Sequence, residues 1–210
     1  MTTNNNQTTT SFFPVKESFY SLQGEGHHSG IAAYFIRLEG CNIRCDWCDT
    51  KTSWNINKNN FLTVNQIIHN INSKVKTIVI TGGEPMMWNL SPLTRILKKK
   101  GYRIHVETSG SYPIHEDFID WITISPKKKK LPLKENYKKM NELKIIICDE
   151  NDFFFAEEQA GYVKKNSHCV LLLQPEWNQN IKIIPKIISY IKNHPKWKIS
   201  LQIHKMLNIP

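Results

Sequence analysis

Short apolar runs alternate along the chain with stretches of helical periodicity. Seven runs rich in isoleucine and valine are predicted to form strands, over residues 33–38, 77–80, 104–107, 121–124, 143–148, 169–173 and 197–203. Four amphipathic stretches between them are predicted to form helices, over residues 64–71, 92–100, 152–165 and 181–194. Strands that alternate with crossover helices predict an α/β fold with a mostly parallel sheet.

The ends of two predicted helices carry capping signals. Thr63 and Ser91 stand where helix N-caps are expected, and Pro92 suits the first helical position. Gly101 follows the second helix at the place of a C-cap glycine. No internal repeat or long linker divides the chain, so we expect one domain over residues 16–210 and a disordered N-terminal segment over residues 1–15.

Polar or glycine-rich clusters follow five of the predicted strands. They lie at residues 40–41, 81–85, 107–110, 125–127 and 174–176. The carboxyl ends of parallel strands meet at one edge of a sheet, where α/β proteins bind their ligands. One such cluster would be an ordinary turn, but five along one edge predict a ligand cleft.

The composition favours anionic partners and argues against a membrane or secreted protein. Among 210 residues, 28 lysines and arginines against 18 acidic residues give a net charge of +10, which favours anionic partners without choosing among them. No apolar run approaches the ~18 residues that a membrane-spanning helix needs. The first ten residues lack the basic start and apolar stretch of a signal peptide. We therefore expect a soluble cytoplasmic protein that has no membrane partner.

Three of the five cysteines, Cys41, Cys45 and Cys48, lie within eight residues. Clustered thiols indicate metal ligands or a redox pair rather than a disulfide framework. Zinc would need a fourth ligand such as His27 or His28, and a redox pair would not need a third cysteine. A [4Fe–4S] cluster on three thiolates would keep one iron open for a ligand. The other two, Cys148 and Cys169, lie in apolar runs and are expected to be buried packing residues.

The motifs around these cysteines resemble the radical S-adenosylmethionine (SAM) enzymes. Cys-x3-Cys-x2-Cys follows the first predicted strand, Trp47 precedes the last cysteine, and Gly-Gly-Glu-Pro (82–85) follows the second strand. The resemblance implies a [4Fe–4S] cluster on the three cysteines and SAM on its open iron. The paired glycines would let the backbone approach the methionine part of SAM, and Trp47 would flank its adenine.

Further motifs resemble the 7-carboxy-7-deazaguanine synthase family over about residues 19–210. They are SLQGEG (21–26), FIRLEGCNIRCDWCDT (35–50), TGGEP (81–85), VETSG (106–110), SPK (125–127), LLLQPEW (171–177) and LQIHKMLNIP (201–210). The resemblance implies a partial (β/α) barrel that converts 6-carboxy-5,6,7,8-tetrahydropterin to 7-carboxy-7-deazaguanine, a queuosine precursor, with loss of ammonia. It also implies Mg²⁺, a homodimer and an external electron donor such as flavodoxin.

The same resemblance implies residue roles. The implied substrate contacts are Leu22, Gln23, Gly24, Arg37, Thr81 and Pro210, and Thr50 would bind Mg²⁺. The implied SAM contacts are Gly83, Ser125, Pro126, Lys127, Gln174, Pro175, Glu176 and Trp177. Arg37 suits bidentate binding of a carboxylate, with a surface ion pair to Glu39 as the alternative. For Lys127 and Gln174 the alternative is an ordinary loop exit.

Two other functions compete with this interpretation. A glycyl-radical activating enzyme shares the cysteine spacing and Gly-Gly-Glu-Pro, but has no use for the SLQGEG stretch. A zinc-bearing basic RNA-binding module would need a recognition motif that the sequence lacks, and the lysines are scattered. We therefore expect no nucleic-acid partner.

Overall fold

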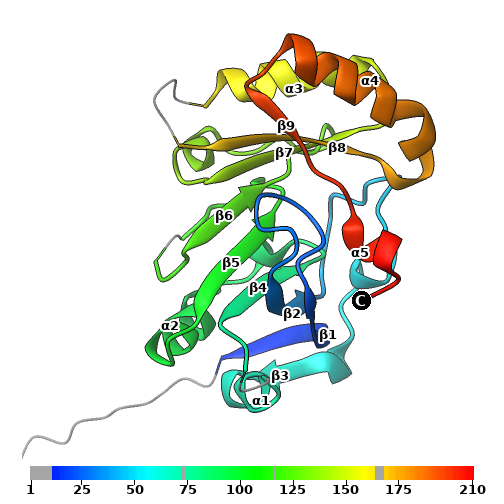
Figure 1. The fold of residues 1–210 in the computed structure, drawn as a ribbon. Coiled ribbons are helices and arrows are strands. Elements are labelled where there is room, and N and C mark those ends of the chain that lie inside the picture. The colour runs from blue at the N-terminus through cyan, green and yellow to red at the C-terminus, as the bar shows by residue number, and fades with distance from the viewer. Residues whose placement is uncertain (1–10, 72–73, 116, 164–167) are drawn as a thin grey trace, which may run out of the picture.

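The computed structural model describes residues 11–71, 74–115, 117–163 and 168–210, which build a nine-stranded open sheet in the order β3-β1-β2-β4-β5-β6-β7-β8-β9 (Figure 1). From β2 to β9 neighbouring strands are parallel, whereas β1 pairs antiparallel with β2 and β3. The strands are β1 Phe12–Leu22, β2 Ala32–Leu38, β3 Phe61–Thr63, β4 Thr77–Gly82, β5 Arg103–Thr108, β6 Trp121–Ile124, β7 Glu142–Ile147, β8 Val170–Pro175 and β9 Trp197–Ile199. The predicted α/β fold with a mostly parallel sheet is confirmed.

Helices α1 to α4 correspond to the four predicted ones. The helices are α1 Val64–His69, α2 Ser91–Lys99, α3 Asn151–Gly161, α4 Asn180–Asn193 and α5 Ile203–Leu207. Thr63 caps α1 in a reciprocal capping box with Gln66, as its position predicted. Gly101 follows α2 with a φ of +85°, which favours glycine. No helix in the described part of the chain is long and apolar enough to cross a membrane.

Several boundaries differ from the sequence prediction. Ser91 is the first residue of α2 rather than its N-cap, because Leu90 holds the cap position. The last predicted strand stops at Ile199, and Ile203 begins α5 instead. Residues 1–10 lie outside the described residues, but Phe12 to Val15 belong to β1, so the predicted boundary at residue 15 is wrong. Residues 164–165, the end of the third predicted helix, also lie outside the described residues.

The two faces of the sheet have different compositions. On one face, buried isoleucine, leucine and valine side chains of β2 to β7 form the main hydrophobic core, for example Ile36, Ile78, Ile80, Ile104, Val106, Ile124 and Leu143. Successive side chains of a strand point to opposite faces. The alternate residues Arg37, Thr81, Glu107, Thr123, Lys144 and Gln174 accordingly line a cavity on the other face.

Candidate active site

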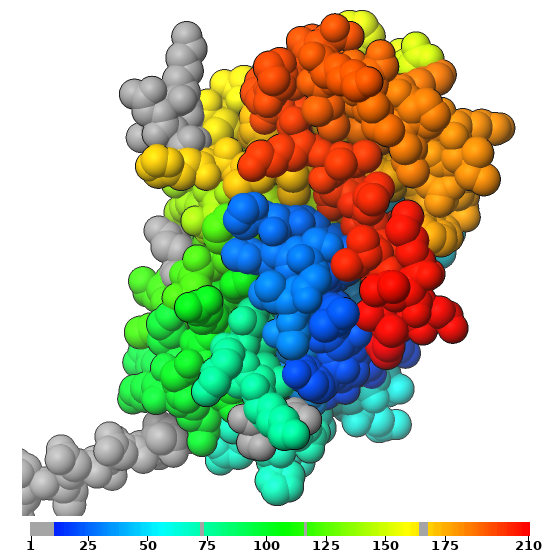
Figure 2. Space-filling view, in the orientation of Figure 1, coloured from blue at the N-terminus to red at the C-terminus, as the bar shows by residue number. Residues whose placement is uncertain are grey.

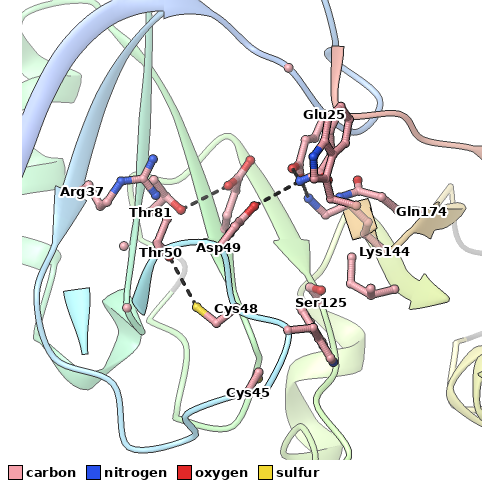
Figure 3. A pocket seen from close by; sticks show the side chains of 18 of the residues that line it. Glu25, Arg37, Cys45, Cys48, Asp49, Thr50, Thr81, Ser125, Lys144 and Gln174 are labelled. Atoms are coloured by element: carbon pink, nitrogen blue, oxygen red, sulfur yellow. Dashed lines mark hydrogen bonds and ion pairs between the residues drawn. The ribbon is translucent and has the colours of Figure 1, made fainter. Parts of the chain in front are cut away.

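A cavity of about 520 Å³ opens at the carboxyl ends of the parallel strands (Figure 3). That volume suits a nucleoside-sized ligand together with a second small molecule. The predicted site residues that line it are Leu22, Gln23, Gly24, Arg37, Cys41, Cys45, Trp47, Cys48, Thr50, Thr81, Gly83, Ser125, Lys127, Gln174, Pro175, Glu176, Trp177 and Pro210. Pro126, which was also predicted, is buried and is not among the lining residues.

The cysteine loop, residues 39–54, is fixed at its base by hydrogen bonds of its own backbone. The Gly40 N–H donates to the Ser53 carbonyl at 2.9 Å, and the Cys41 N–H donates to the Trp54 carbonyl at 3.0 Å. Buried Glu39 accepts bonds from the Asn57 N–H and the Asn60 side chain, both at 2.7 Å. The three thiols on this loop are free and partly exposed to the cavity. The chain therefore holds the loop in shape through its own contacts.

Three free thiols on one loop are the kind of ligand set that an iron–sulfur cluster needs. Three thiolates on one zinc ion would lie about 3.8 Å apart, because each Zn–S bond is about 2.3 Å long. Among the described residues, no three histidine, cysteine or acidic side chains converge in this way on one metal ion. In a cluster each thiolate binds a different iron. The proposed fourth zinc ligands do not line the cavity of the thiols, since the ring of His27 stacks on Trp121 and the ring of His28 lies against His105.

Gly82 and Gly83 are required by the chain's own backbone. Gly82 has a φ of +143°, and a Cβ there would lie 2.2 Å from the Leu38 carbonyl oxygen. A Cβ on Gly83 would lie 2.4 Å from the carbonyl oxygen of Gly40. From the sequence alone, these glycines were predicted to make room for SAM. The contacts with Leu38 and Gly40 supply a different reason, which is the close packing of the end of β4 against the end of β2 and the start of the cysteine loop.

Glu84 joins two of the predicted loop clusters. Its buried carboxylate accepts hydrogen bonds from the Ser109 N–H at 2.8 Å, from the Ser109 hydroxyl and from the Thr108 hydroxyl. The backbone N–H of Glu84 donates to the Gly40 carbonyl at 2.8 Å. The sequence placed these motifs at one edge without giving Glu84 a role. These four bonds fix the ends of β4 and β5 relative to the cysteine loop.

Glu107 lies among the predicted substrate residues. It accepts a bond from the Gln23 amide at 2.9 Å and another from the Thr81 hydroxyl at 3.2 Å. Arg37 is paired through Nε with Glu17 at 2.7 Å, so the alternative of an ion pair with Glu39 is wrong. Glu17 is the only ionic partner of Arg37 in the described part of the chain, and the terminal guanidinium nitrogens accordingly keep their donors for a ligand.

Buried Lys144 and largely buried Glu25 form an ion pair at the far side of the cavity (Figure 3). Burial alone would raise the pKa of Glu25, but the adjacent ammonium lowers it to about 2. Burial would lower the pKa of Lys144, yet Glu25, Glu107 and Glu142 together raise it above its ordinary value. This pair was not predicted from the sequence, because Lys144 lies in an apolar run, 119 positions from Glu25.

Lys127 faces the thiols from the end of β6. Its ammonium donates to the Ser125 hydroxyl at 2.7 Å and lies 4.7 Å from the centre of the Trp47 ring. Burial lowers the pKa of Lys127. None of the described carboxylates forms an ion pair with it, so it is available to an anionic ligand. Glu176, by contrast, has a structural contact, since its side chain caps the short turn Trp177–Gln179.

Comparison with known proteins agrees with this geometry. Residues 35–126 match the radical SAM superfamily. The 7-carboxy-7-deazaguanine synthase of Flavobacterium psychrophilum is 49% identical over 197 residues, covering 94% of this chain and 92% of that protein. The Escherichia coli protein of the same name is 31% identical over 94% of this chain and 99% of its own length.

The solved structures lead to the same group. The crystal structure of QueE from Escherichia coli superposes with a TM-score of 0.81 at 28% identity, covering 91% of this chain and 94% of that chain. Radical SAM proteins hold a [4Fe–4S] cluster and SAM, which suits the free thiols and the cavity described above. Similarity of this extent shows that the chain belongs to the 7-carboxy-7-deazaguanine synthase family of the radical SAM superfamily.

Proposed function

We propose that this chain converts 6-carboxy-5,6,7,8-tetrahydropterin to 7-carboxy-7-deazaguanine with release of ammonia. The observation that carries the proposal is that one cavity holds both halves of the chemistry. Cys41, Cys45 and Cys48 line it on one side, and the hydrogen-bonded group around Glu107 lines it on another. A cofactor bound at the thiols would therefore face a substrate bound at Glu107.

When bound and reduced, the cluster and SAM would supply a 5′-deoxyadenosyl radical that takes a hydrogen atom from carbon 6 of the pterin. The chain would hold SAM through side chains around the thiols. Lys127 would pair with its carboxylate, because this partly buried ammonium has only a hydroxyl and a ring face as partners among the described residues. Trp47 would flank the adenine, and Gly83, Ser125 and residues 174–177 would complete this wall of the cavity.

The substrate would occupy the part of the cavity around Thr81 and Glu107. Arg37 would bind the carboxylate of the pterin through its terminal guanidinium nitrogens. Gln23 and Glu107 offer an amide and a carboxylate to the polar edge of the ring system, and Pro210 lines the cavity beside Ser21. These groups would orient the substrate and exclude water, so that the hydrogen atom to be removed faces the cofactor.

Thr50 would be the protein ligand of Mg²⁺. Its hydroxyl lies at the cavity wall, 3.6 Å from the thiol of Cys48. Mg²⁺ prefers oxygen ligands and keeps several positions for water or substrate. An ion held by Thr50 would help to orient the carboxylate of the substrate.

Electrons would come from an external one-electron donor such as flavodoxin. The clustered free thiols suit a reducing compartment, so we expect the chain to act in the cytoplasm. We also expect a homodimer, as the resemblance to the family implies.

The test is turnover by protein whose cluster is reconstituted without oxygen. Purified chain, SAM, Mg²⁺ and a chemical reductant are mixed with the carboxypterin, and the products are followed by liquid chromatography and mass spectrometry. We expect 7-carboxy-7-deazaguanine and ammonia in equal amounts, with less 5′-deoxyadenosine than product. Loaded protein that cleaves SAM but leaves the pterin unchanged would overturn the substrate assignment.

A further inference from the structure

The segment after β9, residues 200–210, lies across the cavity and contacts two loops that come from distant parts of the sequence. In Figure 2 this red segment packs directly against the blue residues near position 25. The Ile203 N–H donates to the Gly24 carbonyl, and the Gly26 N–H donates to the Ser200 hydroxyl, both at 2.9 Å. A Cβ on Gly24 would lie 2.0 Å from the His204 ring. The contact is therefore close and specific.

Two side chains of this segment connect the loops to each other. The Gln202 amide donates to Glu25 at 2.7 Å and to Asp49 at 3.2 Å. The Lys205 ammonium donates to the same Asp49 oxygen at 2.9 Å and to the Gln202 side chain at 3.2 Å. Asp49 directly follows the last cysteine of the cysteine loop, and Glu25 belongs to the loop after β1. Gln202 and Lys205 thus form a clamp between the thiols and the substrate side of the cavity.

The clamp makes little contribution to the hydrophobic core. No residue of α5 is buried, and Met206 and Leu207 are more than half exposed. None of the described residues 200–210 belongs to the hydrophobic core clusters. The segment therefore contacts mainly the two loops that line the cavity, and the hydrophobic core is built from other residues.

We propose that Gln202 and Lys205 are positioning residues, which fix the loop around Glu25 relative to Asp49 so that substrate and cofactor keep a reactive spacing. This inference rests on the proposed function. Misplacement of reacting groups by about 1 Å can cost on the order of 100-fold in rate. A radical formed beside a misplaced substrate would take its hydrogen atom from the reductant or the protein instead and would give 5′-deoxyadenosine without product. Loosening the clamp should therefore separate SAM cleavage from product formation.

The test compares Gln202→Met/Lys205→Met with the wild-type chain and with Lys198→Met, which removes an exposed lysine of β9 outside the clamp. Iron content should be equal in all three. We expect the ratio of 5′-deoxyadenosine to product to rise about tenfold in the double variant only. Amide exchange of peptides containing Gly26 and Ile203 should also accelerate about tenfold, measured by mass spectrometry of the cluster-loaded protein.

Several results would overturn the inference. An unchanged rate of amide exchange would show that the clamp does not hold the loops. Faster exchange with an unchanged ratio of 5′-deoxyadenosine to product would show that the clamp is a structural contact without a positioning role. Lys205→Met alone, which removes one partly exposed side chain, serves if the double variant does not fold, and should shift both readouts in the same direction. Failure of the proposed function is distinguishable, because the wild-type chain itself would then make no product while the exchange measurement still decides whether the clamp exists.

Discussion

The two faces of the sheet, carried by the same strands, differ in how their side chains are held. On the core face Ile80 and its neighbours are buried among many interchangeable apolar groups. On the cavity face Thr81, the next residue of β4, has a hydrogen bond to one carboxylate, that of Glu107. Apolar packing is non-directional and spread over many contacts, whereas a hydrogen bond depends on one partner. Substitutions on the core face should therefore cost stability, and substitutions on the cavity face should cost activity.

The largest expected effect lies at the edge of the cavity face. Cys45→Ala should abolish iron loading and product formation, because three thiolates are the least that can hold the cluster. The controls Cys148→Ala and Cys169→Ala should load iron normally and lose about 1–2 kcal/mol of stability. Both control thiols are partly buried rather than fully buried as the sequence predicted. Partial burial raises the pKa of each to about 12, so they are protonated at pH 7. Iron analysis decides the matter, and loss of iron from the Cys169 variant would refute the assignment.

Lys144→Met is expected to be an exception to this distinction. Lys144 lies on the cavity face but is buried, so removing its charge should cost stability. The substitution leaves Glu25 buried without its partner, which should cost about 3–5 kcal/mol of unfolding free energy at pH 7. In the wild-type chain the depressed pKa of Glu25 adds stability above the usual value near 4.5, and this is lost as the pH falls toward 2. In the variant, burial should instead raise the pKa of Glu25. Acid then protonates the carboxylate and removes the cost of an unpaired buried charge.

The cost of Lys144→Met should therefore shrink between pH 7 and pH 4, measured by urea unfolding with Lys198→Met as the control. A pH-independent loss of stability would show that the pair is not coupled as described.

Ile80→Ala and Thr81→Val are the matched pair for the comparison. Ile80 is fully buried, so its truncation should cost about 2–5 kcal/mol of stability and leave kcat/KM of the folded protein nearly unchanged. Thr81→Val keeps the shape and deletes the hydroxyl that donates to Glu107. It should lower kcat/KM about 10- to 100-fold, because Glu107 loses the contact that holds it toward the substrate. The stability cost should be smaller than that of Ile80→Ala, because both groups line the cavity, where water can replace the bond. The opposite pattern would remove the distinction between the faces.

The smallest effect is expected for Thr50→Val. This variant should load iron normally but need severalfold more Mg²⁺ for half-maximal turnover, because it removes the protein oxygen at the proposed ion site. A Mg²⁺ titration that superposes on that of the wild-type chain would exclude Thr50 as a ligand.

Local patterns in the sequence were sufficient to predict the core face. Continuous runs such as residues 77–80 and 143–148 are typical of strands buried in a parallel sheet. β1 was missed because Pro14, Lys16 and Glu17 interrupt its apolar pattern, and β3 because it has only three residues. α5 was missed because Ile203 follows a β-rich run, and its position depends on the loop at Gly24 rather than on helix propensity.

On the cavity face, only residues that belong to short sequence motifs could be predicted. The three cysteines and the glycines at 82–83 stand in such motifs, and the structure places them together. The partners Glu17, Glu107 and Lys144 could not be assigned, because each acts across the sheet on a residue far away in sequence. Arg37 shows the difficulty, since its ion-pair partner is set by the register of β1 against β2 rather than by neighbouring residues.

The most direct test of the account is the electron paramagnetic resonance spectrum of the reduced, cluster-loaded protein with and without SAM. Three thiolates leave one iron without a protein ligand, so SAM should alter the spectrum of a chain that contains about four irons. The account predicts this change in the wild-type chain and in Cys169→Ala, and no cluster signal in Cys45→Ala. A cluster spectrum that SAM leaves unchanged, or a chain that binds zinc in place of iron, would contradict it.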